Sequence, residues 1–221
     1  MYKLGLGDVS ENCTNSKTDF KKAAGMGCKF GLVRATTTGI WNYALGKPTM
    51  RQDVRFGVNV DSMKAAGIQP IPYCWFDPRP QLTGLEQASF YLNALAFMGF
   101  GYMPVVDVEN SGSVAVYTAA SIQRLHIWLD VVEAAFHVKP AIYCYPSFVD
   151  RLASMADIGW MSAYPFIVAH WDVAAPRVPF PWYPGGWIGW QYTAYAAPLP
   201  YGFVSADSKP PSRICLAVWN D

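Results

Sequence analysis

Two acidic side chains, Asp107 and Glu109, end the apolar run YMPVVDVE at residues 102–109. In a β-strand, residues two positions apart leave the same face, with Cα atoms roughly 6 to 7 Å apart. Two like charges on an apolar strand raise the pKa of one carboxyl group, which then keeps its proton near neutral pH. Glycoside hydrolysis needs such a proton donor and an anion that stabilises positive charge at the anomeric carbon. Without further context, the same pattern is more typical of a strand that ends in a solvated turn.

Eight short apolar runs, each bounded by turn residues, predict the strands that must position this pair. These predicted strands span 3–9, 30–36, 69–76, 102–109, 139–145, 165–171, 186–192 and 214–219. Segments with helical periodicity lie between several of them, at 19–26, 53–66, 84–98, 119–136 and 147–155. Repeated strand–helix units indicate a mainly parallel sheet, and continuously apolar strands suit a sheet covered on both faces.

We therefore predict an α/β fold with one domain over residues 1–221, a single TIM-like (β/α) barrel. After residue 170 the predicted strands follow one another through loops rich in Pro and Gly, such as PRVPFPWYPGG, with no room for a helix. The last third of the barrel is therefore expected to be irregular.

Catalytic side chains of a (β/α) barrel lie at the carboxyl ends of its strands, and polar residues end several of the predicted ones. Besides the pair already described, these residues are Asp8, Asp77, His170, Asp172 and Gln191. We expect a ring of carboxylates and aromatic rings around one opening. Asp77 precedes Pro78 and is equally suited to capping a turn.

Aromatic side chains near the strand ends are candidates for stacking on sugar rings. The predicted substrate-binding residues are Tyr73, Trp75, Tyr145, Trp171, Gln191 and Tyr192. For any single Trp in a strand, the protein core is the more common location.

The composition excludes several classes of protein. Charged residues make up 15% of the chain and the net charge is +1, which provides no basic surface for nucleic acid. The longest apolar stretches are interrupted by Gly, Pro or Gln191, so no membrane span is predicted. The five cysteines and three histidines lack metal-ligand spacing, so we expect no metal site. A cysteine protease built on Cys144 and His170 is a weak alternative.

The order and spacing of several motifs resemble those of glycoside hydrolase family 25, the Chalaropsis-type lysozymes. The motifs run nearly end to end: GLGDVSEN, KFGLVRATTTG, DVRFGVNVDSMKAAGI, PYCWFDP, QASFYL, PVVDVEN, AIYCYPSF, PFIVAHW and WIGWQYT. The resemblance implies hydrolysis of the β-1,4 bond between N-acetylmuramic acid and N-acetylglucosamine in bacterial peptidoglycan. It also implies retention of configuration, with the acetamido oxygen of the substrate as nucleophile and no cofactor.

By position, Glu109 matches the general acid of the family, Asp107 its neighbouring carboxylate and Asp8 the carboxylate that ends the first strand. Two positions depart from the family pattern. Cys215 stands where the family commonly has an Asp on the last strand. The histidine of the third-strand motif is replaced by Cys74 or by Trp75, depending on the register.

Two other functions are compatible with parts of this pattern. A family 18-type chitinase also has a barrel and an Asp-X-Glu ending, but PVVDVEN lacks the longer acidic run of that family. A peptidoglycan-binding protein with impaired catalysis would fit the missing Asp at position 215. The amino terminus lacks the features of a Sec signal peptide, so we expect a monomeric phage lysin, or endolysin, that reaches the bacterial cell wall by another route.

Overall fold

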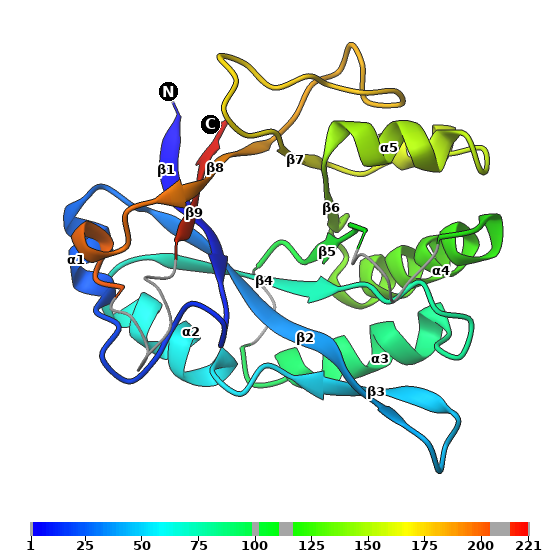
Figure 1. Cartoon of the computed structure of the whole chain (residues 1–221), viewed down its shortest axis with the longest axis horizontal. Coiled ribbons are helices and arrows are strands. Elements are labelled where there is room, and N and C mark those ends of the chain that lie inside the picture. The colour runs from blue at the N-terminus through cyan, green and yellow to red at the C-terminus, as the bar shows by residue number, and fades with distance from the viewer. Residues whose placement is uncertain (1, 99–101, 111–116, 204–212, 221) are drawn as a thin grey trace.

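The computed structural model describes residues 2–98, 102–110, 117–203 and 213–220, and its main feature is a closed barrel of eight strands (Figure 1). In barrel order the strands are β1 (Lys3–Val9), β2 (Phe30–Asn42), β4 (Gln69–Trp75), β5 (Val105–Asp107), β6 (Ala141–Cys144), β7 (Phe166–Ala169), β8 (Gly189–Ala196) and β9 (Ile214–Trp219). Neighbours are parallel from β1 to β8, while β9 is antiparallel to both β8 and β1. All eight predicted strands are present, and the predicted α/β barrel is confirmed.

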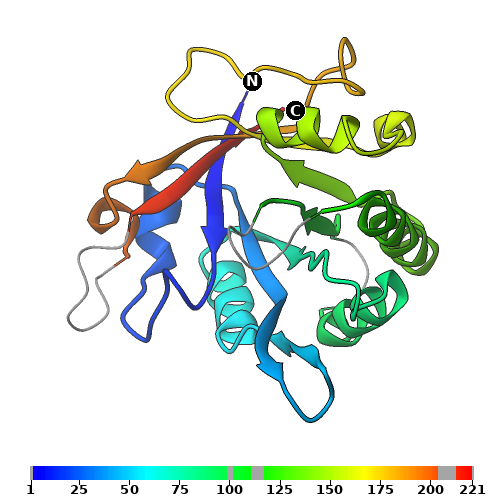
Figure 2. The same ribbon diagram turned by 45° about the vertical axis from the view of Figure 1, so that its right-hand side comes forward.

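The α-helices that the described residues form lie outside the barrel, as the two ribbon views show (Figures 1 and 2). They are α1 (Phe20–Gly25), α2 (Phe56–Ala65), α3 (Gly84–Leu95), α4 (Ala119–Phe136) and α5 (Pro146–Ala153). Thr83 and Thr118 begin α3 and α4 with capping boxes, and the Asp19 carboxylate accepts from the backbone N–H of Lys21 at the start of α1. Each helix falls within or beside a predicted helical segment.

Strands β7, β8 and β9 are joined without α-helices, as expected from the Pro- and Gly-rich loops. In the described part of these connections the only helix is the short 3₁₀ helix η3 (Leu199–Tyr201), after β8. Another 3₁₀ helix, η2 (Gly159–Ala163), follows α5 in the connection from β6 to β7. The loop between β7 and β8 contains two cis peptide bonds, Phe180–Pro181 and Tyr183–Pro184.

A β-hairpin that the sequence analysis did not predict projects from the barrel (Figure 1). Strand β2 continues to Asn42, well past the predicted end at residue 36, and pairs with β3 (Lys47–Gln52) in antiparallel fashion. The Asn42 side chain accepts from the backbone N–H groups of Ala44 and Leu45, and Gly46 has φ +61°, a value that favours glycine.

Alternate residues of the strands build two separate cores. Inside the barrel, buried apolar side chains such as Leu32, Tyr73, Val105 and Ile167 pack together. Between the barrel and the helices, their chain neighbours such as Val33, Cys74, Val106 and Val168 join a larger core. The strict alternation means that a residue two positions after an interior residue also points inward, toward the end of the barrel where the strands finish.

Candidate active site

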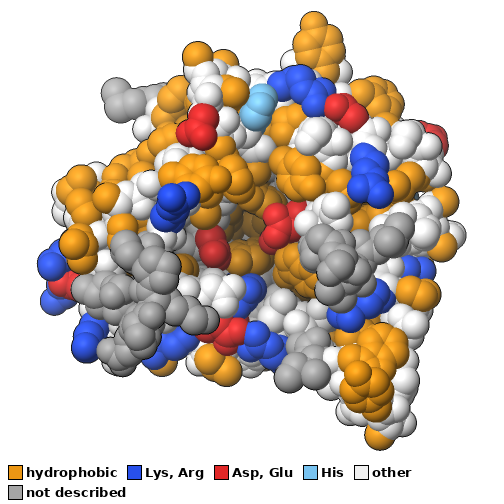
Figure 3. All heavy atoms as spheres, in the orientation of Figure 1, with side chains coloured by type: hydrophobic (Ala, Val, Ile, Leu, Met, Phe, Trp, Pro, Cys, Tyr) orange, Lys and Arg blue, Asp and Glu red, His pale blue; other side chains and the backbone are white. Residues whose placement is uncertain are grey.

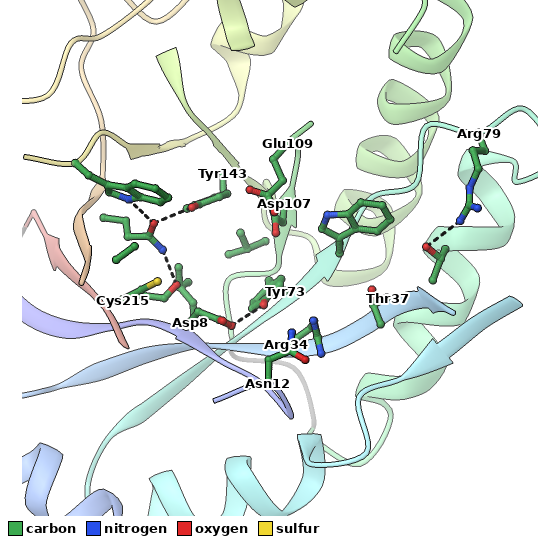
Figure 4. Close-up of a pocket in the computed structure, with 18 of the residues that line it drawn as sticks. Asp8, Asn12, Arg34, Thr37, Tyr73, Arg79, Asp107, Glu109, Tyr143 and Cys215 are labelled. Carbon is green, nitrogen blue, oxygen red and sulfur yellow. Dashed lines mark hydrogen bonds between the residues drawn. The ribbon is translucent and has the colours of Figure 1, made fainter. Parts of the chain in front are cut away.

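A cavity of about 660 Å³ opens at the carboxyl ends of the parallel strands (Figure 4). The space-filling view shows acidic side chains around a hollow in this face (Figure 3). The lining residues are Gly7, Asp8, Asn12, Leu32, Arg34, Thr37, Thr38, Trp41, Tyr73, Trp75, Arg79, Val105, Asp107, Glu109, Tyr143, Trp171, Gln191, Ala194 and Cys215. The three predicted catalytic carboxylates therefore share one cavity.

Asp8 reaches this cavity because β1 contains an irregularity. Leu6 pairs with Gly31 and Val9 pairs with Val33, so β1 has one more residue than β2 between these partners. Leu6 and Val9 are both buried in the outer core, while Gly7 and Asp8 between them both line the cavity. Such a bulge re-aims a side chain that strict alternation would send to the other face.

The Asp8 carboxylate is fixed by two hydroxyl groups. Tyr73 donates to its Oδ1 over 2.7 Å, and Ser10 donates to its Oδ2 over 3.3 Å. Burial raises the pKa of Asp8, while the Tyr73 hydrogen bond and the positive charge of Arg34 offset part of that rise. Asp8 is thus an oriented carboxyl group in a poorly solvated position.

Asp107 ends β5, and Glu109 follows it on the same side of the strand. Burial raises the pKa of Asp107 well above the ordinary range, and the charges of Glu109 and Asp8 add to this effect. Burial and the charge of Asp8 also raise the pKa of Glu109, against a hydrogen bond from Trp75 that lowers it. The two carboxyl groups together therefore retain a proton at a pH where isolated carboxyl groups would be ionised.

The Asp107 side chain lines the cavity but is largely buried. Its Oδ1 is shielded from solvent and has no hydrogen-bond partner among the described residues. A buried carboxylate oxygen without a partner is costly, which favours the protonated form of this carboxyl group.

Arg34 is a cavity residue that the sequence analysis did not select. Its Nε donates to Asp53 over 2.9 Å, and its Nη2 lies 3.2 Å from a carboxylate oxygen of Glu11, which also pairs with Arg51. The charge of Arg34 lowers the pKa of both Asp8 and Asp107. Its partner Asp53 is far away in the sequence and reaches it only in the folded barrel, which is why residue spacing did not reveal this cation.

The side chain of Gln191, on β8, links this strand to β1, to β6 and to Trp171 after β7. Its Oε1 accepts from the Tyr143 hydroxyl over 2.9 Å and from the Trp171 indole over 2.8 Å, while its Nε2 donates to the Gly7 carbonyl over 3.1 Å. Gly7 leaves room for this contact, since an added Cβ would lie 2.9 Å from the Gln191 Cγ. Gln191 thus ties β8 to β1 and to β6.

Replacing Gln191 with Met should lower the free energy of unfolding by about 1–3 kcal/mol, because buried polar partners would lose their hydrogen bonds. Urea unfolding of the two proteins measures the difference. Gln123→Met on the exposed side of α4 is the matched control and should change stability by less than about 0.5 kcal/mol. Equal stability of Gln191→Met and the wild type would contradict the stabilising role of the Gln191 hydrogen bonds.

The predicted substrate-binding residues are placed at different sites. Tyr73, Trp75, Trp171 and Gln191 line the main cavity. Tyr145 lines an adjoining cavity of about 500 Å³, which also includes Glu109, Tyr143 and Trp171. Their roles in binding remain predictions.

Tyr192 lies apart from the other predicted substrate-binding residues. Its neighbour Gln191 points into the barrel, so alternation turns Tyr192 toward the outer core, where its ring lies 5.9 Å from that of Trp190. Tyr192 lines neither cavity in the described part of the chain.

The structure also locates Asp77, His170 and Asp172, the remaining polar residues at the predicted strand ends. Asp77 is fully buried outside the cavity, where it binds the guanidinium of Arg79, and Arg79 itself lines the cavity. His170 and Asp172 line the adjoining cavity. Asp77 also accepts from the backbone N–H of Arg79, which fits the alternative prediction that Asp77 caps a turn.

The two departures from the family pattern both lie at the cavity. Cys215 lines it beside Asp8, and burial together with the charges of Asp8 and Glu109 raises the pKa of its thiol to about 12. Trp75 also lines it, whereas Cys74 points to the outer core. The register therefore puts Trp75, rather than Cys74, at the inward position of the third-strand motif.

Several further cavity residues were missed by the sequence analysis: Asn12, Thr37, Thr38, Trp41 and Tyr143. Period-two alternation would have found Tyr143, which lies two positions before the predicted Tyr145. Thr37, Thr38 and Trp41 belong to the part of β2 that continues beyond the predicted strand end at residue 36.

Within the described ranges, no group of three or more His, Cys, Asp or Glu side chains is arranged to hold a metal ion. The helices of the same ranges are all too short or too polar to cross a membrane.

Comparisons with known proteins agree with this geometry. A sequence model of the family described as "Glycosyl hydrolases family 25" matches residues 8–197. "Lysozyme M1" of Streptomyces globisporus is 29% identical over 186 residues, a match that covers 78% of this chain and 56% of that protein. The chain thus spans little more than half the length of this curated relative.

Two solved structures have the same fold. The bacterial lysozyme from Streptomyces coelicolor superposes with a TM-score of 0.75 at 24% identity, covering 99% of this chain and 92% of the other. A family GH25 lysozyme from Aspergillus fumigatus gives a TM-score of 0.73 at 18% identity, covering 100% and 95% of the two chains.

Proposed function

Because the chain belongs to glycosyl hydrolases family 25, we propose that it is a lysozyme, a 1,4-β-N-acetylmuramidase that acts on bacterial peptidoglycan. The observation that supports this most directly is the convergence of Asp8, Asp107 and Glu109 on one cavity lined by aromatic rings. The bond cleaved is the β-1,4 linkage between N-acetylmuramic acid and N-acetylglucosamine.

In this proposal Glu109 is the general acid. It is less buried than Asp107 and lines both the main and the adjoining cavity, so it can reach an oxygen that lies between two sugars. Burial and the charge of Asp8 raise the pKa of Glu109, which favours the protonated form that can give its proton to the glycosidic oxygen as the bond to the anomeric carbon breaks. The resulting carboxylate then accepts a proton from the water that completes hydrolysis.

Asp107 and Asp8 stabilise the charge that develops during the reaction. Asp107, which lines the cavity with Glu109, is suited to orient the acetamido group of the muramic acid so that its oxygen attacks the anomeric carbon as the glycosidic bond breaks. Water then displaces the acetamido oxygen from the anomeric carbon, and the two inversions together give retention of configuration. Asp8, held by Tyr73, adds a further carboxyl group to the same cavity.

The first test is to incubate the protein with purified peptidoglycan and to identify the new reducing ends. N-acetylmuramic acid at these ends supports the proposal. N-acetylglucosamine ends would instead make the protein a glucosaminidase, and the absence of new ends on every wall tested would contradict hydrolysis.

The dependence of activity on pH should report the proton shared by the carboxyl groups. A proton donor with a raised pKa works below that pKa and fails as the pH rises through it, so kcat/KM should fall on the alkaline side. The charge of Asp8 raises the pKa of both Glu109 and Asp107. Asp8→Asn should therefore move the alkaline limb to lower pH.

The residual activity of Asp8→Asn, measured as kcat/KM on soluble glycan fragments across the pH range, gives this shift. Asp61→Asn, at an exposed position of α2, is the control and should keep the wild-type profile. An alkaline limb that stays in place or moves to higher pH would contradict the effect of the Asp8 charge on the pKa values of Glu109 and Asp107.

A second candidate function rests on Cys215, which occupies the cavity wall where the family commonly has an Asp. The barrel would then bind peptidoglycan without cleaving it efficiently. A suspension of wall fragments separates the alternatives, because a lysozyme clears it and a binding protein only sediments with it. Monomeric behaviour, delivery as a phage lysin and the lack of a nucleic-acid partner stay predictions.

A further inference from the structure

A second opening lies at the other end of the barrel, where the parallel strands begin. Its cavity of about 940 Å³, here called the amino-end cavity, shares no described lining residue with the catalytic one. Phe30 and Ile71 point into it from the barrel interior, two positions before Leu32 and Tyr73, which line the catalytic cavity. The volume falls in the range of small-molecule sites, roughly 300 to 1,000 Å³, and the proposed catalysis does not use it.

The floor of the amino-end cavity is apolar, and two of its rings lie against glycines. Phe30 and Trp219 pack edge to face with ring centroids 5.0 Å apart. An added Cβ at Gly5 would overlap the Phe30 ring, and one at Gly189 would lie 2.9 Å from the Trp219 ring. Both rings therefore occupy space that side chains of β1 and β8 would otherwise fill. The other apolar lining residues are Leu4, Met26, Ile71 and Met103.

The mouth of the amino-end cavity is polar and carries positive charge. Lys3 begins β1 and Lys29 directly precedes β2, and both are exposed lining residues. Gln69 and Asn220 add exposed amide groups. No Asp or Glu is among the described residues that line this cavity. Cationic groups thus surround an apolar floor.

We propose that the amino-end cavity binds a single-chain amphipathic anion, such as a fatty acid, with its apolar chain on the floor and its carboxylate beside Lys29. Burial of the chain removes apolar surface of both partners from water, and the lysine charge attracts the head group. The methionines have flexible side chains that can adapt to such a chain. This inference goes beyond the proposed lysozyme function and does not depend on it.

Titration calorimetry with octanoate, decanoate and dodecanoate, each below its micelle-forming concentration, tests the apolar part of the site. The affinity should rise about fourfold for each CH₂ group that enters the cavity. Decyltrimethylammonium, a cation with the chain length of decanoate, should bind at least about tenfold more weakly than decanoate. An affinity that does not depend on chain length, or equal binding of the two head groups, would overturn the proposal.

The charge at the mouth is tested with Lys29→Glu, which should lower the affinity for decanoate by at least about tenfold. Lys21→Glu is the matched control, because Lys21 is exposed on α1 and does not line the cavity. It changes the net charge equally and should keep the wild-type affinity. Equal losses in the two variants would mean a general charge effect and would overturn the site.

NMR spectra of the whole chain locate the bound anion. Decanoate should shift the backbone amide signals of Lys29, Gln69 and Asn220 and leave those of Asp8 and Glu109 in place. Shifts centred on Asp8 and Glu109 would put the anion in the catalytic cavity and overturn the proposal. Sedimentation with phosphatidylglycerol vesicles without binding of decanoate would also overturn it, because the lysines would then contact a membrane surface.

Discussion

Glu109→Gln should lower the rate of peptidoglycan hydrolysis by at least about a hundredfold, because general acid catalysis contributes that much or more. The amide has nearly the shape of the carboxyl group but cannot donate its proton to the leaving oxygen. Binding should change little, because the residue stays polar and fills the same place between the two cavities. Initial rates of reducing-end release, with sedimentation of the variant on wall fragments, measure both properties.

Glu133→Gln is the matched control, because Glu133 lies on α4, outside the barrel. It should retain the wild-type rate. A Glu109→Gln variant with more than about a tenth of the wild-type rate would show that another group supplies the proton. In that case Asp107, the other member of the pair, would be the carboxyl group to replace next.

Asp107→Asn should change activity and stability in opposite directions. The rate should fall by about 10²–10³-fold, the usual effect of removing one group that stabilises developing charge. The melting temperature should stay the same or rise, because the variant replaces a buried carboxyl group whose pKa is raised by burial and by two neighbouring carboxylates. Initial rates and thermal unfolding of the same preparation measure the two effects.

Asp61→Asn on the exposed side of α2 should change neither the rate nor the melting temperature. If Asp107→Asn lowers both quantities together, Asp107 has a structural role and its charge is not the reason for the lost rate. A variant that keeps the wild-type rate would remove Asp107 from the catalytic proposal.

The barrel and the carboxylate pair could be predicted because local patterns determine both. Each strand is an apolar run of its own, and Asp107 and Glu109 lie on one face because of the geometry of a single strand. Asp8 was found because it ends the first run. The bulge that turns it inward depends on pairing with β2, which no single segment of the sequence contains.

The errors also have physical causes. Gln191 and Tyr192 were both predicted to bind substrate. Only Gln191 lines the main cavity, while Tyr192 packs against the outer core beside the register shift that β8 has between Gln191 and Thr193. The hairpin of β2 and β3 was missed because its residues are polar and only half-buried, which leaves no apolar run. Arg34 was missed because its partners Glu11 and Asp53 meet it only in the folded barrel.

The position of β9 has a consequence for the order in which the protein matures. This strand is the last of the barrel along the chain, yet it lies between β8 and β1 and contributes Cys215 to the wall beside Asp8. During synthesis, a domain emerges from the ribosome with its amino-terminal part first. While β9 is still inside the exit tunnel, β1 lacks one of its two neighbours and the ring stays open. The ring therefore closes only once β9 is available, and a polypeptide interrupted before residue 214 should be inactive on peptidoglycan.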